Sequence, residues 1–205
     1  MKTMALTDDA ILEAATVIRS GGTVVYPTET AYALGADPFN TAAVGNVFAL
    51  KGRSENKPLG LIAASREQVE EHCVINPVES QLMDHYWPGA LSIVLPIRAP
   101  QDAEREAFMH TTAGWDTVSI RVSGSPWARK LAEAVGRPII ATSANISGGP
   151  NCFTVGDLAK QFSGDRQPDL LLDGGDLPAS AMSTLVAVQE GKPVVLRQGA
   201  VRLSE

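Results

Sequence analysis

The chain has 205 residues, of which 44% are apolar and 20% charged, a composition typical of a globular domain with a buried core. It carries 17 Lys and Arg against 23 Asp and Glu, so the formal net charge is −6. This charge excludes a global positive field for nucleic acid or a membrane surface. An anionic ligand therefore needs a local group of cations.

The start of the sequence predicts a cytoplasmic protein. The first residues lead directly to Asp8 and Asp9 without the apolar core of a signal peptide. No apolar stretch reaches the roughly 20 residues that a membrane-spanning helix needs. Cys73 and Cys152 lie far apart in no ligand spacing, which favours two partly buried thiols over a zinc site or a disulfide framework.

Helical and strand patterns follow one another along the chain. Thr7 is a typical helix N-cap, and apolar residues recur at helical spacing until Gly21. Residues 23–26 are a β-rich run, and a polar loop begins after Pro27, which lacks an N–H for a sheet. Further helices are predicted around residues 41–50, 66–72, 77–86, 126–135 and 155–162, and strands at 59–63, 91–97, 117–122, 139–142, 169–172, 184–188 and 193–197.

This mixture predicts an α/β fold in which helices flank a twisted, mostly open mixed sheet. No repeat and no Pro- or Ser-rich linker divides the sequence, so we expect one domain over residues 1–205. Residues 99–114 are charged and lack a clean period, which fits either a lid or an ordinary surface loop.

A local group of cations follows the helix predicted at residues 41–50. Within seven residues the sequence has three cations, Lys51, Arg53 and Lys57, and one acid, Glu55. A cation at a helix C-terminus offsets the helix dipole by about 0.3 to 1 kcal/mol, and this alone explains Lys51. Arg53 and Lys57 lie beyond the last turn in a loop with Gly, Asn and Pro. An extended basic loop of this kind suits a polyphosphate.

Polar residues also alternate with apolar ones in the strand predicted at residues 117–122. Thr117, Ser119 and Arg121 share one face of that strand. Thr117 and Arg121 lie about 13 Å apart at ~3.3 Å per residue, so this face can contact two parts of an elongated ligand. A half-exposed strand with its polar side in water explains the same pattern.

Small polar residues gather where other predicted strands end. The buried run at residues 139–141 leads into Thr-Ser-Ala-Asn-Ile-Ser-Gly-Gly-Pro, residues 142–150. Hydroxyls, an amide and glycines at the carboxyl end of a strand are typical of a ligand crevice in an α/β sheet, and also of an ordinary turn. Similar polar groups stand at residues 26–30, 183–184 and 197–199. Common nucleotide-binding loops and hydrolase motifs are absent from the sequence.

Taken together, these pieces resemble the YrdC family, the threonylcarbamoyl-AMP synthases, and the length resembles its short, single-domain form. The resemblance runs from about Gly21 to Gly199. The sequence departs from the usual family pattern at Ala31, Ala33, Ser54 and Met182. The matching motifs are GGTVVYPTET (21–30), LGAD (34–37), LKGR (50–53), KPL (57–59), WPG (87–89), VSIRV (118–122), TSANISG (142–148), ST (183–184) and LRQG (196–199).

The resemblance implies a YrdC-like fold and a specific reaction. Family members join L-threonine, bicarbonate and ATP, with Mg²⁺, into threonylcarbamoyl-AMP and pyrophosphate. Other proteins then transfer the threonylcarbamoyl group to adenosine 37 of certain tRNAs, forming N6-threonylcarbamoyladenosine. The implied partners are these small substrates, the downstream transfer proteins and, weakly, tRNA, with no membrane. No side chain is assigned to the metal.

The resemblance also assigns residues to this reaction. Lys51 and Arg53 are the expected catalytic residues, because cations at the departing pyrophosphate offset its charge. The expected ATP-binding residues are Arg53, Lys57, Thr117, Asn145, Thr154 and Arg197. The expected threonine-binding residues are Thr28, Arg121, Ser143 and Ser183, with Arg121 as the partner of the carboxylate.

Two other functions stay open on the sequence. One is an RNA-binding module, against which the net charge of −6 argues. The other is a YrdC-like domain that handles a different carbamoyl donor and forms a divergent carbamoyl-adenylate. Pyrophosphate release distinguishes the three, because only the synthase needs both L-threonine and bicarbonate.

Overall fold

The computed structural model describes residues 1–98 and 102–203. Its described part has the mixed α/β architecture with open sheets that the sequence predicts, but the strands divide between two sheets instead of one. The first sheet contains β1 (Lys2–Ala5), β2 (Val24–Pro27), β3 (Tyr32–Gly35), β8 (Thr142–Ser143) and β9 (Leu170–Asp173). The second contains β4 (Leu61–Ala63), β5 (Leu91–Pro96), β6 (Thr117–Val122), β7 (Ile139–Ile140), β10 (Thr184–Gln189) and β11 (Lys192–Arg197).

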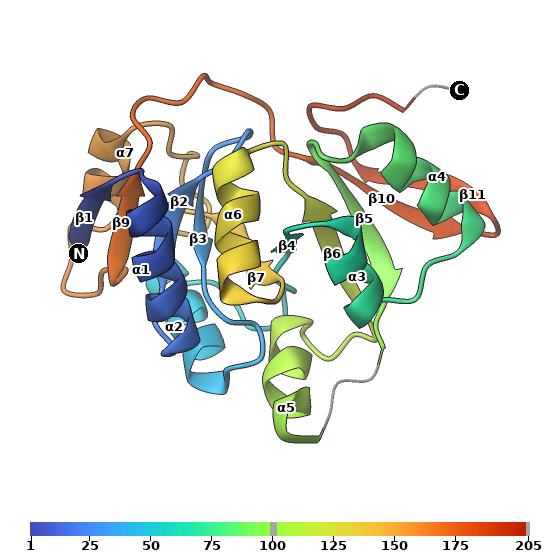
Figure 1. Ribbon diagram of the computed structural model, residues 1–205, viewed down its shortest axis with the longest axis horizontal. Helices are drawn as coiled ribbons and strands as arrows, with labels where there is room; N and C mark the ends of the chain where they lie inside the picture. Colours follow the sequence, from blue (N-terminus) through green and yellow to red (C-terminus); the bar gives the residue numbers. More distant parts are fainter. Residues whose placement is uncertain (99–101, 204–205) are drawn as a thin grey trace.

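Both sheets are mixed, and they lie side by side (Figure 1). The first has the order β1-β9-β2-β3-β8, in which β9 pairs in parallel with β1 and β2, and β3 runs antiparallel to β2 and β8. The second has the order β11-β10-β5-β6-β4-β7, with parallel pairs β10/β5 and β6/β4 and antiparallel neighbours elsewhere.

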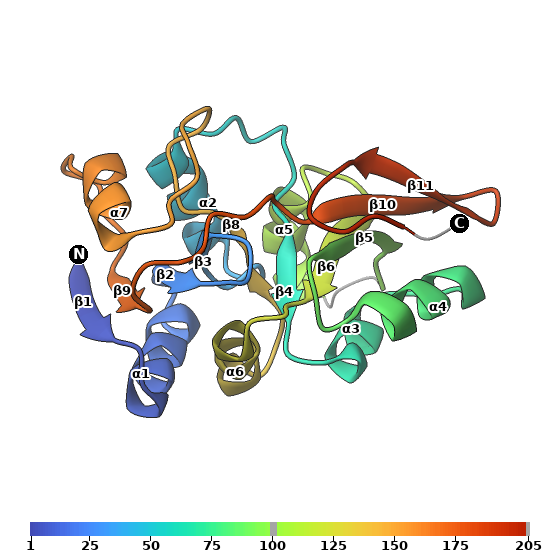
Figure 2. The same ribbon diagram turned by 90° about the horizontal axis from the view of Figure 1, so that it is seen from above.

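Helices cover both sides of the sheets. Figure 2 shows α1 and α6 on one side and α2 and α7 on the other. Helix α6 packs against α1, β2 and β4, so it covers the line along which the two sheets meet. No described helix is long and apolar enough to cross a membrane. The helices are α1 (Asp8–Arg19), α2 (Thr41–Lys51), α3 (Arg66–His72), α4 (Pro77–Tyr86), α5 (Asp102–Thr111), α6 (Pro126–Val135) and α7 (Val155–Gln161).

The two sheets join where the sequence predicts a single strand over residues 139–142. In the structure β7 pairs with β4 in the second sheet, whereas β8, two residues later, pairs with β3 in the first. Gly35 is required here, because a Cβ at this position would lie 2.6 Å from the Tyr26 ring and 2.9 Å from the Ile140 carbonyl oxygen. We call residues 139–145 the seam.

Sequence patterns missed β1, β3 and α5. Residues 102–111 of the segment interpreted as a lid or loop form the helix α5, which packs against α2, whereas residues 99–101 lie outside the described residues. Ala107 and Phe108 are buried, and the Phe108 ring stacks on Phe39 with centroids 4.8 Å apart. The helix has few apolar residues, and its last residue, Thr111, is polar although it is buried, so no clean apolar period revealed it in the sequence.

Candidate functional site

Lys51 is the last residue of α2, and the sequence places it there by capping the helix at both ends. The Asn40 side chain accepts a hydrogen bond from the Ala43 N–H at the beginning of α2. Gly52 adopts a left-handed conformation, with φ of 55°, at the C-cap. The left-handed turn ends the helix, so Arg53 and Lys57 lie in the loop that follows.

The Lys51 side chain is buried, with 1% of its surface exposed, and it points into the seam. Its Nζ donates to the Ser143 carbonyl oxygen, to the Asn145 carbonyl oxygen at 2.9 Å and to Asn145 Oδ1 at 3.1 Å. Burial, reinforced by the nearby charge of Arg53, lowers the pKa of Lys51 to about 8. The ammonium group therefore clamps the 143–145 turn with all three of its donors.

A cavity of about 360 Å³ opens beside this clamp. Arg53 folds over it and donates from Nη2 to the Pro58 carbonyl oxygen at 2.9 Å. Burial lowers the pKa of Arg53, which stays far above neutrality in any protein. We call this space the lysine cavity. Its lining residues are Lys51, Gly52, Arg53, Ser54, Lys57, Ser143, Asn145, Ser147 and Gly148.

A second cavity, of about 390 Å³, shares Arg53, Lys57 and Ser143 with the lysine cavity. It lies between β6, the seam and the start of β10, and Leu59, Leu61, Met182 and Leu185 give it an apolar part. We call it the arginine cavity. Its lining residues are Arg53, Lys57, Pro58, Leu59, Gly60, Leu61, Ser92, Ser119, Arg121, Ala141, Thr142, Ser143, Met182, Ser183, Leu185 and Arg197.

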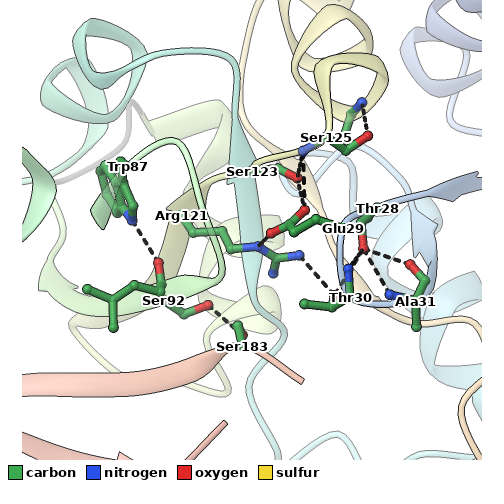
Figure 3. A network of polar contacts seen from close by, with 12 residues as sticks. Thr28, Glu29, Thr30, Ala31, Trp87, Ser92, Arg121, Ser123, Ser125 and Ser183 are labelled. Carbon is green, nitrogen blue, oxygen red and sulfur yellow. Dashed lines mark hydrogen bonds and ion pairs between the residues drawn. The ribbon is translucent and has the colours of Figure 1, made fainter. Parts of the chain in front are cut away.

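Arg121 extends from β6 between the two sheets (Figure 3). Its Nε donates to Glu29 Oε1 at 3.1 Å, and its Nη2 to Thr30 Oγ1 at 3.5 Å. Burial raises the pKa of Glu29, but the Arg121 charge and a hydrogen bond from Ser123 outweigh burial, so the pKa lies below its usual value. Glu29 is therefore ionised at neutral pH.

Arg197 and two serines form another wall of the arginine cavity. Arg197 Nη2 donates to the Ser183 carbonyl oxygen at 2.9 Å and to Ser183 Oγ at 3.2 Å. The hydroxyls of Ser183 and Ser92 lie 2.9 Å apart. Burial, together with the charge of Arg121, lowers the pKa of Arg197. Three guanidinium groups, those of Arg53, Arg121 and Arg197, thus line one cavity, an arrangement that favours a guest with an anionic group such as a carboxylate.

The charge balance of the two cavities is strongly positive. Together they are lined by Lys51, Arg53, Lys57, Arg121 and Arg197. Among the described residues, only Arg121 of these five forms an ion pair with a carboxylate. Four cations thus lack an acidic partner, although the chain as a whole is acidic. Such a local excess of positive charge is typical of a site for a polyanion.

Most of the predicted site residues meet at these cavities. Arg121, Ser143 and Ser183, all predicted to bind threonine, line the arginine cavity together with Arg197. Three other cavities, of about 390, 450 and 500 Å³, contain none of the predicted residues. The residues predicted for ATP that line the lysine cavity are Arg53, Lys57 and Asn145, beside Lys51.

Three predicted residues do not line either cavity. The hydroxyl of Thr28 bonds with the backbone of its own loop, including the Ala31 carbonyl oxygen at 2.6 Å. Thr117 begins β6 opposite Pro96. Thr154 caps α7, since its hydroxyl accepts from the Asp157 N–H while the Asp157 carboxylate accepts from the Thr154 N–H.

Sequence reasoning also missed residues of the site. Ser119 lines the arginine cavity where Thr117 does not; the alternation along the strand had placed it on the same face as Arg121, but the family resemblance gave it no role. Ser92 on β5 carries no pattern that separates it from any other strand serine. Glu29 lies one residue beyond Thr28 in a polar loop, and only the fold reveals that it meets Arg121.

Comparisons with known proteins agree with this geometry. A family model for Sua5, YciO and YrdC, described as "Telomere recombination", matches residues 16–199. A threonylcarbamoyl-AMP synthase of Pyrococcus abyssi is 38% identical over 194 residues, which are 94% of this chain and 54% of that protein. One of Bacillus subtilis is 35% identical over 195 residues, or 95% of this chain and 54% of that protein. The chain thus spans about half the length of these two relatives.

Two solved structures also superpose on nearly the whole of this chain. The crystal structure of P. abyssi Sua5 complexed with L-threonine superposes with a TM-score of 0.83 and 36% identity, covering 97% of this chain and 56% of that one. Escherichia coli YciO superposes with a TM-score of 0.80, covering 97% and 96% of the two chains. At 23% identity, the second likeness concerns the fold alone.

Proposed function

Because the chain belongs to the Sua5/YciO/YrdC family, we propose that it is a threonylcarbamoyl-AMP synthase, a nucleotidyltransferase that makes threonylcarbamoyl-AMP and pyrophosphate from L-threonine, bicarbonate and ATP. One observation carries the proposal. Two adjoining cavities share Arg53, Lys57 and Ser143 as a common wall, and four of the five cations that line them have no carboxylate partner among the described residues.

The two cavities suit different parts of the substrates. Phosphate oxygens of ATP fit the lysine cavity, where Arg53 and Lys57 supply N–H donors and Lys51 supplies charge. L-Threonine fits the arginine cavity, where Arg121 suits its carboxylate and the nearby leucines suit its methyl group. A threonine complex of the P. abyssi relative supports this amino acid as substrate. The shared wall then lies where the α-phosphate and the carbamate meet.

The reaction needs no protein nucleophile. The threonine amine and bicarbonate form a carbamate and release water. A carbamate oxygen then forms a bond to the α-phosphorus as the bond from this phosphorus to the bridging oxygen breaks, and pyrophosphate leaves. Holding the reactants in line lowers the barrier by roughly 7 to 11 kcal/mol. Arg53 and Lys57 neutralise the charge that develops on the leaving group.

Mg²⁺ fits this site as a partner of the ATP phosphates. The described residues contain no group of three or more His, Cys, Asp or Glu side chains that could hold a metal ion by themselves. The lysine cavity offers hydroxyl and amide oxygens from Ser143, Ser147 and Asn145. Mg²⁺ commonly keeps several waters and is held largely by substrate phosphates, where it offsets their charge.

The product defines the proposed partners and place of action. Threonylcarbamoyl-AMP is a mixed anhydride, so a second protein must accept its acyl group for transfer to adenosine 37 of tRNA. Cytoplasmic action and weak tRNA contact are part of the same proposal. The net charge of −6 favours transfer of the adenylate to such a protein over tight binding of tRNA by this chain.

Pyrophosphate release from MgATP tests the function. We expect release only when L-threonine and bicarbonate are both present, with threonylcarbamoyl-AMP as the co-product. Release driven by carbamoyl phosphate without threonine would indicate a different carbamoyl donor. Release that depends on RNA, or no release under any condition, would contradict the proposal.

A further inference from the structure

Arg121 keeps most of its hydrogen-bonding capacity for a ligand. A guanidinium group has five N–H donors. Nε is engaged by Glu29 and one N–H of Nη2 by Thr30, so three donors have no acceptor among the described residues. Arg121 lines the arginine cavity, whereas Glu29 and Thr30 do not. The two partners therefore leave part of the guanidinium fork available to the cavity.

Glu29 is itself fixed from several directions. Its second oxygen, Oε2, accepts from the Ser123 hydroxyl and from the Ser125 N–H at 3.4 Å. Gly124 packs on its stem, since a Cβ at Gly124 would lie 3.3 Å from Glu29 Cγ. Figure 3 shows this carboxylate between Arg121 and Ser125. Contacts from Arg121, Ser123 and Ser125 thus hold the carboxylate in one position.

The contact between Glu29 and Arg121 also joins the two sheets. Glu29 lies in the loop between β2 and β3 of the first sheet, and Arg121 lies on β6 of the second. Within that loop, Thr28 Oγ1 accepts from the N–H groups of Thr30 and Ala31 at 3.2 and 3.3 Å, which orders the loop from inside. Arg121 is therefore held by a loop that belongs to the other sheet.

We propose that Glu29 is a positioning residue that orients Arg121, so that the free N–H groups of the guanidinium receive the carboxylate of the amino-acid substrate. This inference rests on the proposed function. A free arginine side chain loses rotamer entropy when it is fixed, and a side chain that is ordered before binding does not lose this entropy again when substrate arrives. Glu29 thereby sets the affinity for threonine without touching it.

The first experiment compares Glu29→Gln, Glu29→Asp and wild type in the pyrophosphate assay. For Glu29→Gln we expect KM for L-threonine to rise at least fivefold, with KM for ATP within twofold. Glu29→Asp keeps the charge and should recover part of the loss. Glu79→Gln is the control, since Glu79 is more deeply buried than Glu29 but caps α4 away from the two cavities. Unchanged or tighter use of threonine by Glu29→Gln would overturn the proposal.

A second substrate isolates the carboxylate. L-Threoninamide lacks the negative charge that Arg121 would bind, so Glu29→Gln and wild type should use it with equal kcat/KM. The preference of wild type for L-threonine over the amide should shrink in Glu29→Gln by the same factor as the rise in KM. A loss that is equal for both substrates would mean that Glu29 is merely structural, and would contradict the proposal.

Calorimetry separates this inference from the proposed function. L-Threonine should bind wild type and bind Glu29→Gln at least fivefold more weakly, whether or not turnover occurs. If Glu29→Gln does not fold, Ser123→Ala keeps both charges, removes one hydrogen bond to the carboxylate and should weaken threonine binding twofold or more. Pyrophosphate release without any effect of these changes overturns only the inference. Wild type that binds no threonine overturns both.

Discussion

The two adjoining cavities differ in how their cations are neutralised. In the lysine cavity, Lys51 is held by three neutral oxygens of the seam, and neither Arg53 nor Lys57 has a carboxylate partner among the described residues. In the arginine cavity, Arg121 is paired with Glu29, whereas Arg197 has no carboxylate partner among the described residues. The unpaired cations Lys51, Arg53 and Lys57 suit a triphosphate, whereas an arginine paired with a carboxylate suits the carboxylate of an amino acid whose own charges cancel.

This difference in the partners of the cations explains how two cavities beside one seam can bind two unlike substrates. A buried charge without a partner is costly, and a guest of opposite charge relieves that cost. The lysine cavity therefore gains most from a polyanion. In the arginine cavity, the ion pair with Glu29 already offsets part of the cost of burying Arg121. The position of the guanidinium group therefore matters more for binding there than net charge does.

Removing the unpaired cations should have the largest effect. We expect Lys51→Ala and Arg53→Ala each to lower the rate of pyrophosphate release at least tenfold, since a charged hydrogen bond is worth about 1.5 to 3 kcal/mol. Lys130→Ala is the control, because Lys130 is an exposed lysine paired with Asp8 on the surface. An unchanged rate in either cavity variant would remove that residue from the triphosphate site.

Raising the pH should weaken the lysine cavity selectively. The pKa of Lys51 is lowered to about 8, so its charge disappears as the pH rises through this value. We expect a nonhydrolysable ATP analogue to bind about threefold to tenfold more weakly at pH 9 than at pH 8. Lys51→Arg stays charged and should show a flatter dependence. Equal slopes for the two proteins would show that Lys51 does not carry the effect.

The lowered pKa of Lys51 has the opposite effect on stability: raising the pH weakens ATP binding but increases the free energy of unfolding. In the unfolded chain Lys51 has its ordinary pKa of 10.5, above the folded value of about 8. Between these values the unfolded chain binds more protons, so the contribution of Lys51 to the free energy of unfolding rises with pH. Below pH 8 the cost of burying the charged lysine is fully present. Denaturant titrations between pH 8 and pH 10.5 should show that the free energy of unfolding rises more steeply with pH in wild type than in Lys51→Met.

The smallest expected effect concerns Thr154, which caps α7. Thr154→Ala should lower the free energy of unfolding by about 1 kcal/mol, and Thr154→Ser should stay close to wild type. Urea denaturation measures both. The family resemblance also predicts an ATP contact for this residue. A higher KM for ATP in folded Thr154→Ala would support that contact, and an unchanged KM would limit Thr154 to its capping role.

Local sequence patterns predicted most helices and strands, because capping residues and apolar spacing act over a few residues. Thr7 before α1, Gly21 after it and the alternation along β6 are examples. The division into two sheets depends on tertiary pairing. Residues 139–142 look like one buried strand, and only the partners β4 and β3 separate β7 from β8.

The candidate site was predictable in its composition and not in its geometry. Lys51, Arg121 and Ser143 were singled out from local patterns and from the family resemblance, yet nothing in those patterns shows that the seam brings them together. Glu29 was missed because a carboxylate in a polar loop is ordinary until its partner on another sheet is known. Conversely, Thr154 shows that a residue assigned by resemblance can have a complete structural explanation.

The most direct test of the account follows three labels into one product. ATP labelled at the α-phosphate, labelled L-threonine and labelled bicarbonate should enter a single compound in equal amounts, with one pyrophosphate released for each. That result is predicted if the joined cavities bring the α-phosphate and the carbamate into contact. Formation of AMP and pyrophosphate without incorporation of threonine and bicarbonate would contradict it.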